Sequence, residues 1–265
     1  MTTQPDFSQD LSEDERIDRI NEQLCLIQKK NGLTFGTDAY LLAAYVRPQP
    51  NARCVDLGSG TGVIPLLLLA RGKVRFVDAV EIQEPFAELI QRNAALNGFA
   101  ERIRVHATDL RDLTAEQLGG EVDLVLANPP YMRTDCGKRN LADAKYLARH
   151  EVCGGIADFC AAAARILRFG GRFLCVFRPD RLSDLMAALR DAGLEPKRMQ
   201  FVHADSAAEP CMVLLDCTKG ASPSLRRSPP LFLYERTQKK AEGTRTLTPE
   251  AQAVYASCSF GAENA

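Results

Sequence analysis

The sequence predicts an α/β fold in which a mostly parallel sheet has helices on both faces. The chain has 265 residues and 46% hydrophobic content, which is enough to bury one large core. From residue 52 onward, short apolar runs alternate with helical stretches, the pattern of repeated strand and helix units. A glycine-rich turn follows the first apolar run, at the place where such sheets bind ligands. We therefore expect one main domain over residues 51–217, with shorter segments on both sides.

Composition excludes several classes of protein. The formal net charge is −1, so a surface that binds nucleic acid must be a local one. None of the nine cysteines forms a Cys-x-x-Cys pair, which indicates reduced thiols in a cytoplasmic protein and no metal site. The longest apolar run, Val63 to Ala70, is too short to span a membrane. Residues 1–15 are acidic and lack the apolar segment of a signal peptide.

The first fifty residues divide into two segments. Residues 1–20 are polar, and we expect a disordered or helical leader there. Residues 21–50 contain two apolar runs, 24–28 and 33–35, on either side of Lys-Lys-Asn-Gly. Asn-Gly between apolar runs is typical of a tight hairpin turn. A hairpin followed by a helix is therefore predicted to pack beside the ligand site.

The predicted helix after the hairpin covers residues 39–46. Thr37 or Asp38 can cap its first turn, because a short polar side chain can accept a hydrogen bond from a free backbone N–H. The hairpin would also bring these two side chains to the mouth of the ligand site. A plain cap and a ligand contact both stay open at this point.

The first strand of the main domain, residues 53–57, ends in Gly-Ser-Gly-Thr-Gly at 58–62, before an apolar helix that extends through residue 71. Glycines permit positive φ and let a ligand approach the backbone at a helix N-terminus. The turn lacks the Gly-Lys-Ser/Thr of a P-loop, which argues against ATP or GTP hydrolysis. Asp56 stands two positions before the first glycine, where a carboxylate disfavours a pyrophosphate and favours a cationic ligand.

An acidic residue stands at the end of each of the next two strands. The strand over 75–82 ends near Glu81, about twenty residues past the glycines, where an acid can accept hydrogen bonds from both hydroxyls of a ribose. An ordinary glutamate at a strand end is the alternative. After a helix over 84–96 and a strand over 103–106 comes Asp109. Its carboxylate either accepts a bond from the amino group of an adenine or caps the following turn.

The fourth strand, residues 122–127, leads directly into Asn128, Pro129, Pro130 and Tyr131. The prolines fix φ and remove two donors, so the Asn128 carboxamide and the Pro129 carbonyl can offer two acceptors on one side. Tyr131 offers a flat face for stacking. The arrangement suits a planar amine such as the amino group of adenine, whereas the alternative is a proline-rich turn beside a core tyrosine.

The long segment over 132–150 contains five basic and two acidic side chains. Long loops within a compact domain usually have a function, so a flap that faces the substrate is one interpretation and a solvated polar loop is the other. Further on, helices are predicted over 156–167 and 182–192 and a strand over 172–177.

Two final strands are predicted over 195–202 and 210–217. The short connection between them predicts an antiparallel pair. Residues 218–265 are rich in proline, serine and basic side chains, and we expect a basic tail that either contacts phosphates or is merely solvated.

Together, 55–62, Glu81, Asp109 and Asn-Pro-Pro-Tyr resemble the amino-methylating class of S-adenosylmethionine-dependent methyltransferases. Phe-Gly-Thr-Asp-Ala at 35–39 and Ala-Arg-His-Glu at 148–151 narrow the likeness to the tRNA (adenine-N6)-methyltransferases that modify the adenosine beside the anticodon of a valine tRNA. The likeness runs from about residue 20 to residue 217. It implies a class I, Rossmann-like sheet of seven strands whose last strand is antiparallel, with S-adenosyl-L-methionine as cofactor and tRNA as substrate.

The resemblance also implies roles for individual residues. The catalytic set is Asn128, Pro129, Pro130 and Tyr131. The cofactor-binding set is Thr37, Asp38, Asp56, Gly58, Ser59, Gly60, Gly62, Glu81, Ile82, Asp109, Leu110 and Asn128. The set that binds the substrate is Tyr131, Arg133, Lys138, Arg139, Arg149 and His150. Positioning an amine for in-line attack on a methyl group requires no metal, nucleophilic cysteine or general-base histidine.

Rival functions stay open at this stage. Release-factor glutamine methyltransferases resemble the chain at the glycine turn and at Asn-Pro-Pro-Tyr, but they usually have a larger N-terminal helical domain. A module that binds S-adenosylmethionine or RNA without catalysis would not need the intact residues 128–131. A DNA adenine methyltransferase would be expected to have a separate target-recognition domain.

Overall fold

Seven long strands form the centre of the molecule in the computed structural model, which describes residues 11–30, 36–130, 154–236 and 245–261. They are β3 (Cys54–Leu57), β4 (Val77–Glu81), β5 (Ile103–Ala107), β6 (Val122–Ala127), β7 (Leu167–Phe177), β8 (Leu194–His203) and β9 (Pro210–Lys219). Their order in the sheet is β8-β9-β7-β6-β3-β4-β5. The five strands from β7 to β5 are parallel, and β9 is antiparallel to both of its neighbours. The predicted fold class and the antiparallel final pair are therefore confirmed.

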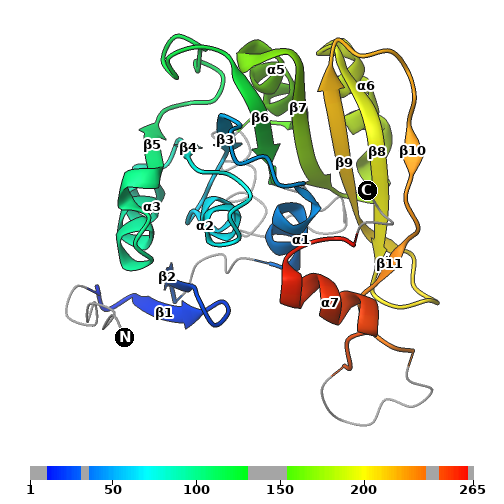
Figure 1. Ribbon diagram of the computed structural model, residues 1–265, viewed down its shortest axis with the longest axis horizontal. Coiled ribbons are helices and arrows are strands. Elements are labelled where there is room, and N and C mark those ends of the chain that lie inside the picture. The colour runs from blue at the N-terminus through cyan, green and yellow to red at the C-terminus, as the bar shows by residue number, and fades with distance from the viewer. Residues whose placement is uncertain (1–10, 31–35, 131–153, 237–244, 262–265) are drawn as a thin grey trace, which may run out of the picture.

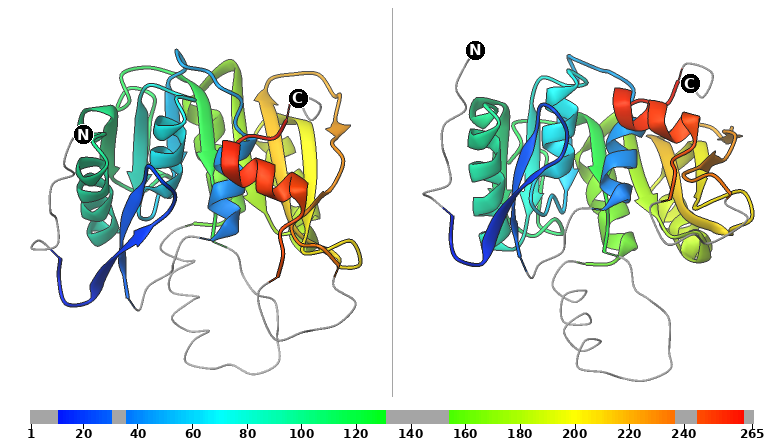
Figure 2. Two further views of the ribbon diagram at one scale, coloured as in Figure 1. Left: turned by 60° about the horizontal axis from the view of Figure 1, so that its bottom comes forward. Right: turned by 90° about the horizontal axis from the view of Figure 1, so that it is seen from below.

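Helices cover both faces of this sheet (Figures 1 and 2). They are α1 (Thr37–Tyr45), α2 (Val63–Ala70), α3 (Glu84–Leu96), α5 (Ile156–Ile166), α6 (Leu182–Asp191) and α7 (Pro249–Ser257), with short 3₁₀ helices at η2 (Ala100–Arg102) and η3 (Pro179–Arg181). Side chains of α1, α2, α3 and α7 share one apolar cluster, and those of α5 and α6 share the other. Within β6, Leu124 and Leu126 join the first cluster while Val125 and Ala127 join the second. Successive side chains point to opposite faces, so a strand buried on both faces needs an unbroken apolar run.

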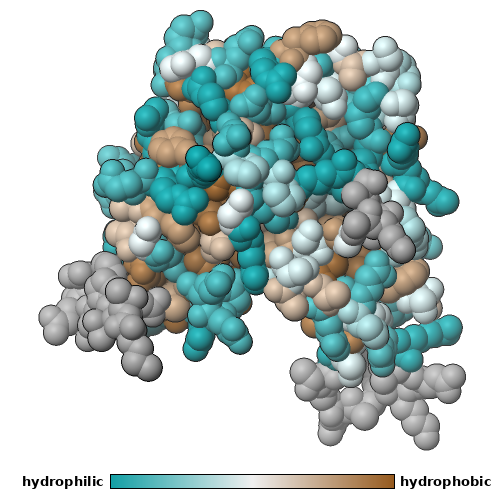
Figure 3. Space-filling view, viewed as in Figure 1, coloured by the Kyte–Doolittle hydropathy of each residue, from teal (hydrophilic) through white to brown (hydrophobic). Residues whose placement is uncertain are grey.

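Hydrophilic side chains cover most of the face shown in Figure 3, with hydrophobic ones interspersed. The large apolar side chains lie mainly inside, between the sheet and its two helical layers. Removing the surface of these apolar side chains from water is the main favourable contribution to the free energy of folding.

The N-terminal hairpin differs from the prediction. It pairs β1 (Glu15–Arg19) with β2 (Cys25–Lys29), and a turn lies between them that the sequence analysis did not predict. The Asn21 side-chain oxygen accepts hydrogen bonds from the N–H groups of Gln23 and Leu24, which closes that turn. The prediction of a disordered or helical leader over 1–20 is thus wrong for residues 15–19. The predicted Asn-Gly turn and the second apolar run, 33–35, lie outside the described residues, as do residues 1–10.

Side chains of α3 hold the hairpin against the main domain. The Asn93 amide accepts a hydrogen bond from the Ile27 N–H at 2.6 Å and donates to the Ile27 carbonyl at 3.2 Å. Asn97, one turn later, bonds both backbone groups of Cys25 in the same way. Two asparagines four residues apart share one helix face, so they act as a neighbouring strand for β2.

The C-terminal region is also more structured than predicted. Beyond β9 it forms two short strands, β10 (Arg226–Arg227) and β11 (Leu231–Phe232), both parallel to β8, and then α7. The Tyr40 hydroxyl of α1 donates to the Tyr255 carbonyl at 2.6 Å. Leu231, Val254 and Cys258 are buried. The expectation of a merely solvated tail over 218–265 is therefore wrong for the described part, because this segment covers the apolar surface of α1. The alternative, a contact with phosphates, stays a prediction.

Smaller differences concern element ends. The α3 helix has the predicted bounds, whereas β7 begins five residues earlier than predicted. The N-cap of α1 is Gly36, and no side chain caps it. Thr37 and Asp38 belong to the first turn of α1, so the prediction of either one as N-cap is wrong.

Candidate active site

Four of the predicted site positions meet at one edge of the sheet. The strand register pairs Leu57 with Val80 and with Ala127, and pairs Glu81 with Ala107. The residues that follow these strands therefore lie at their shared carboxyl edge, where open α/β sheets bind ligands. This edge brings together Gly58, Glu81, Asp109 and Asn128.

The glycine turn after β3 has the backbone that its sequence predicts. Gly58, Gly60 and Gly62 have φ of 70°, 56° and 83°, the left-handed region that favours glycine. The N–H groups of Gly58 and Ser59 donate to the Val80 carbonyl at 2.9 and 3.0 Å, which ties the turn to β4. A Cβ on Gly60 would meet no atom within 4 Å. The middle of the turn therefore borders open space that a ligand can enter.

Glu81 lies directly opposite that turn. Its side chain is buried, and one carboxylate oxygen accepts a hydrogen bond from the Gly60 N–H at 2.9 Å. The other oxygen accepts from the Gln83 N–H at 2.9 Å. Burial raises the pKa of Glu81, while these backbone bonds lower it. The bonds hold the carboxylate at the rim of the turn, so it is positioned to accept bonds from a ligand's hydroxyls.

Asp56 is the most unusual acid of the site. Asp56 is fully buried, and neither of its carboxylate oxygens has a hydrogen-bond partner among the described residues. The pKa of this carboxyl is raised from 3.8 to about 7, mainly by burial and to a smaller extent by the Glu81 carboxylate, while the Ser59 side chain lowers it. A buried carboxylate without a partner is unfavourable, so a cationic ligand would stabilise its charged form.

Asp109 has a partner in this structure. Its carboxylate accepts a hydrogen bond from the Arg111 N–H at 2.8 Å and pairs with the Arg111 guanidinium, which lowers the pKa of Asp109. Its side chain therefore closes the turn after β5, one of the two predicted alternatives, but a partly exposed carboxylate has further lone pairs for a ligand. Nearby, Leu110 is buried in the core and Ile82 is half-buried after β4.

Asn128 follows the last residue of β6 and is half-buried, Pro129 is buried and Pro130 is half-buried. The structure thus places the first three residues of Asn-Pro-Pro-Tyr at the edge shared with the glycine turn. Tyr131 lies outside the described residues. The predicted substrate-binding side chains outside the described residues are Arg133, Lys138, Arg139, Arg149 and His150.

A cleft of about 580 Å³ lies at the same edge, beyond the end of β7. Its lining includes Thr37 and Asp38 from α1 and Phe177 and Arg178 from the end of β7. Since β7 is the neighbour of β6, this cleft lies one strand away from Asn128. Arg178 pairs with Asp180 at 2.8 Å. No sequence motif singles out Arg178, because strand order alone brings it to this cleft.

Two further side chains that the sequence analysis missed support the site from behind. Asn93 donates to the Thr61 carbonyl at 2.9 Å, so the same amide that holds the hairpin also braces the glycine turn. Lys73 is buried and donates to the carbonyls of Ala43, Ala44 and Val46 at the end of α1. Its ammonium satisfies the free carbonyls of a helix C-terminus, while burial lowers the pKa of Lys73 to about 8. A polar residue on the apolar face of α3 was a detectable signal for Asn93.

Among the described residues, the requirements of a metal site and of a membrane-spanning helix are not met. No group of three or more metal-ligating side chains occurs among the described residues. Within the same residues, no helix combines the length and apolar character needed to cross a membrane. The seven cysteines that the structure describes are free thiols.

Comparison with known protein families matches residues 30–189 to the methyltransferase small domain. A tRNA1(Val) (adenine(37)-N6)-methyltransferase of Phocaeicola vulgatus is 32% identical over 198 residues, covering 73% of this chain and 80% of the relative. A protein of the same name from Porphyromonas gingivalis is 30% identical over 200 residues, covering 73% of this chain and 77% of the relative.

Solved structures share the fold. A structure described as a predicted O-methyltransferase from Agrobacterium tumefaciens has a TM-score of 0.66 at 22% identity, covering 85% of this chain and 98% of that one. NSun6 from Pyrococcus horikoshii has a TM-score of 0.52 at 14% identity, covering 71% of this chain and 53% of that one. At these identities the likeness concerns the fold alone.

Proposed function

The chain belongs to the family of tRNA1(Val) (adenine(37)-N6)-methyltransferases, within the methyltransferase small domain family, and we propose that it transfers a methyl group from S-adenosylmethionine to the N6 amino group of an adenosine in tRNA. The target by analogy with these relatives is the adenosine at position 37 of a valine tRNA. One observation supports the proposal above all: Asn128 and Pro129 end the strand next to the one that leads into the open glycine turn. A cytoplasmic location follows from a tRNA substrate.

The side chains at the carboxyl edge fit S-adenosylmethionine. The open space at Gly60 accepts the methionine part of a ligand close to the backbone. Glu81 lies where its carboxylate can accept bonds from the ribose hydroxyls, and Asp109 where it can accept a bond from the adenine amino group. Ile82 and Leu110 would contact the faces of that adenine. The buried Asp56 carboxylate would stabilise the cationic end of the molecule.

Asn128 and Pro129 would act on the target base. When bound, the cofactor supplies a methyl group on a sulfonium, a good electrophile with a neutral leaving group. The N6 amino group of adenine is a weak nucleophile, because its lone pair is delocalised into the ring. The Asn128 carboxamide oxygen and the Pro129 carbonyl would accept its two N–H bonds and favour the tetrahedral nitrogen that attacks the methyl carbon. The surplus proton of the methylated nitrogen would pass to solvent, so these residues would need no metal.

The target base must leave the RNA stack to reach these acceptors. Stacking on Tyr131 would offset part of the cost of unstacking. Arg133, Lys138, Arg139 and Arg149 would contact backbone phosphates around the target, and His150 would help to orient the same segment. These roles rest on the sequence, since the residues lie outside the described ranges.

A labelling experiment tests the proposal directly. The protein is incubated with methyl-labelled S-adenosylmethionine and either total tRNA or a purified release factor, and the products are digested to identify the methylated residue. We expect N6-methyladenosine from a valine tRNA and no label in the release factor. Label on a glutamine of the release factor would assign the rival function, and the absence of label in both would refute an amino-methylating enzyme.

A further inference from the structure

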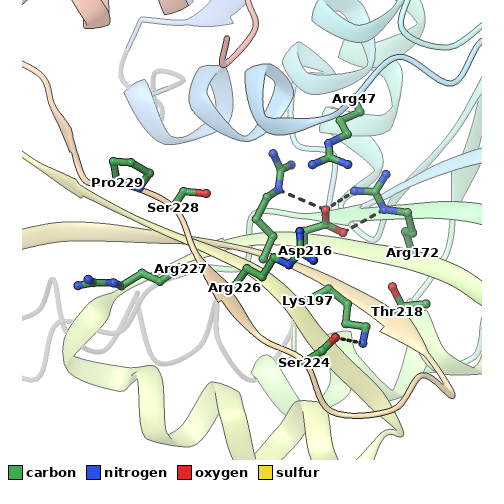
Figure 4. A pocket seen from close by; sticks show the side chains of 11 residues that line it. Arg47, Arg172, Lys197, Asp216, Thr218, Ser224, Arg226, Arg227, Ser228 and Pro229 are labelled. Carbon is green, nitrogen blue, oxygen red and sulfur yellow. Dashed lines mark hydrogen bonds and ion pairs between the residues drawn. The ribbon is translucent and has the colours of Figure 1, made fainter. Parts of the chain in front are cut away.

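A second pocket lies at the opposite, amino edge of the sheet, and its lining is strongly basic (Figure 4). It is bounded by the first residues of β8 and β7, the last residues of β9, the strand β10 and the segment after α1. Its volume is about 520 Å³, within the range of roughly 300–1,000 Å³ for small-molecule sites. Six of its lining side chains are cationic: Arg47, Arg172, Lys197, Arg198, Arg226 and Arg227.

Only part of this positive charge is neutralised. Asp216 is the one acidic side chain among the described residues that line the pocket. Its carboxylate accepts a hydrogen bond from Arg172 Nε at 3.0 Å and lies 3.5 Å from Arg198 Nε. Figure 4 shows the guanidinium of Arg47 turned toward this carboxylate as well, while Arg227 extends away from it. A chain with a formal net charge of −1 therefore concentrates its cations here.

The inner wall of the pocket is preorganised. Arg198 is buried, its guanidinium lies over the Tyr45 ring at 3.8 Å, and it donates to the Tyr45 carbonyl at 2.7 Å. Burial lowers the pKa of Arg198, and the nearby cations Arg47 and Arg172 lower it further. Asp216 offsets part of the repulsion among these cations and raises the pKa of Arg198, but one carboxylate does not balance three guanidinium groups, so an anionic ligand would stabilise the wall further.

The outer wall has arginines whose guanidinium N–H donors can bind a ligand. Arg226 pairs in register with Arg198 across β10 and β8, so both belong to one row of the sheet. Arg47, Arg226 and Arg227 are exposed, and within the part of the chain that the structure describes no hydrogen bond or ion pair engages their side chains. Exposed guanidinium groups on two different segments, the residues after α1 and β10, can therefore meet the same ligand.

The lining also indicates which part of a ligand is bound. Apart from the cations, the described lining is Asp216, Thr218, Ser224, Ser228 and Pro229, with no aromatic side chain. Recognition of a base normally uses aromatic stacking, whereas guanidinium groups and hydroxyls are typical contacts to phosphate oxygens. The chemistry therefore fits phosphate groups and offers no platform for a base.

We infer that this pocket binds phosphate groups of the RNA backbone, as a second contact remote from the methyl-transfer edge. The inference rests on the proposed function, because it takes the substrate RNA as the source of the phosphates. α1 connects the two regions, since its first turn borders the cleft beside β7 and the segment after its last residue contributes Arg47. A folded RNA that is bound at both places would be held on two sides of the sheet, so affinity would exceed that of the target loop alone.

The double variant Arg47→Gln/Arg226→Gln tests this inference. Both side chains are exposed and form no described contact, so the fold is retained. With an unmodified valine tRNA transcript, we expect the Kd to rise about tenfold in a filter-binding assay at low salt. The slope of log Kd against log salt should become shallower by about 1.4–1.8, since each phosphate contact contributes about 0.7–0.9. KM for tRNA should rise similarly while kcat at saturating tRNA stays unchanged.

The control variant Arg75→Gln/Arg190→Gln removes the same charge from exposed arginines on other elements. Its Kd and salt slope should match those of the unsubstituted protein, which separates a local contact from a change in net charge. If the unsubstituted protein methylates tRNA but the Arg47→Gln/Arg226→Gln variant binds it equally well, the inference is overturned and the proposed function stands.

A second experiment measures pyrophosphate binding by calorimetry, with the unsubstituted protein and with the Arg47→Gln/Arg226→Gln variant. If tRNA is neither bound nor methylated, the proposed function fails. The calorimetric measurement then shows by itself whether the pocket binds phosphate groups. Pyrophosphate binding that the variant loses would then assign free phosphorylated molecules as the source, against the RNA backbone. No tRNA effect and no pyrophosphate binding would overturn the phosphate site altogether.

Discussion

The two edges of one sheet present opposite charges. At the carboxyl edge lie Asp56, Glu81 and Asp109, together with the carbonyl acceptors of Asn128 and Pro129. At the amino edge, six cations surround the single carboxylate of Asp216. A near-neutral chain thus separates acceptors from donors along its strands. A cationic cofactor would meet complementary charge at the carboxyl edge, while the amino edge would add phosphate contacts to an RNA whose target base enters at the carboxyl edge.

The acids of the two edges also differ in their partners. Asp216 is held between two arginines, whereas Asp56 has no partner among the described residues. An acid with partners stabilises the fold, while an acid kept without them is available to a ligand and lowers the stability of the free protein. The comparison therefore predicts opposite effects for similar substitutions at the two edges.

The largest expected effect concerns the acceptors at the carboxyl edge. Asn128→Ala should lower the rate of methyl transfer to tRNA by at least about 10²–10³-fold, the effect of losing one group that acts mainly in the transition state. S-adenosylmethionine affinity should change only a few-fold, as measured by equilibrium dialysis beside single-turnover kinetics. Near-normal turnover would refute the role given to this carboxamide.

At the amino edge, Asp216→Asn should destabilise the fold by about 3 kcal/mol, because it leaves Arg172 and the buried Arg198 without their carboxylate. Urea unfolding followed by circular dichroism measures the change. The control is Asp180→Asn, which breaks a more exposed pair with Arg178 and should cost less than about 1 kcal/mol. Equal stabilities for the two variants would contradict the structural role of Asp216.

Glu81→Gln tests whether the carboxyl edge selects its ligand by charge. The amide can still accept the Gly60 N–H bond, but it accepts ribose hydroxyls less strongly, so the Kd for S-adenosylmethionine should rise by about 10–100-fold. Calorimetric titration measures it. The control Glu84→Gln changes an exposed acid three residues later and should bind as the unsubstituted protein does. A Glu81→Gln variant with unchanged affinity would remove this side chain from the cofactor site.

The smallest expected effect is a pH dependence that arises from Asp56. Its pKa of about 7 lies above the ordinary 3.8, so ionisation is disfavoured in the free protein and stability should fall as pH rises through 7. A bound cation lowers this pKa, so S-adenosylmethionine affinity should rise by up to about fivefold between pH 6 and pH 7.

The Asp56→Asn variant supplies the reference for that experiment. The ligand's own amino group titrates equally with both proteins, so the difference between their pH profiles isolates Asp56. The variant should lose the rise in affinity and should unfold at a higher temperature than the unsubstituted protein at pH 8. Parallel profiles would show that Asp56 does not meet the ligand's charge.

The sequence by itself determined the parallel core and the positions of its chemistry. Short apolar runs such as Val122 to Ala127 favour strands buried on both faces, and the glycines at 58–62 favour a turn with positive φ. Residues that follow parallel strands lie at one edge of the sheet. The sequence alone therefore predicted that Gly58, Glu81, Asp109 and Asn128 lie close together. The apolar strands and the glycine turn each depend on a short stretch of sequence, so they can be predicted from the sequence alone.

Only the tertiary structure decided the rest. β1 looked like part of a polar leader, because the partner that pairs its buried Glu15 is Arg92, far away in the sequence. The C-terminal segment looked like a solvated tail, because its few apolar residues become meaningful only when α1 offers a surface for them. The basic pocket draws its cations from four separate segments. Contacts between distant segments depend on how the elements pack, and no local pattern in the chain encodes them.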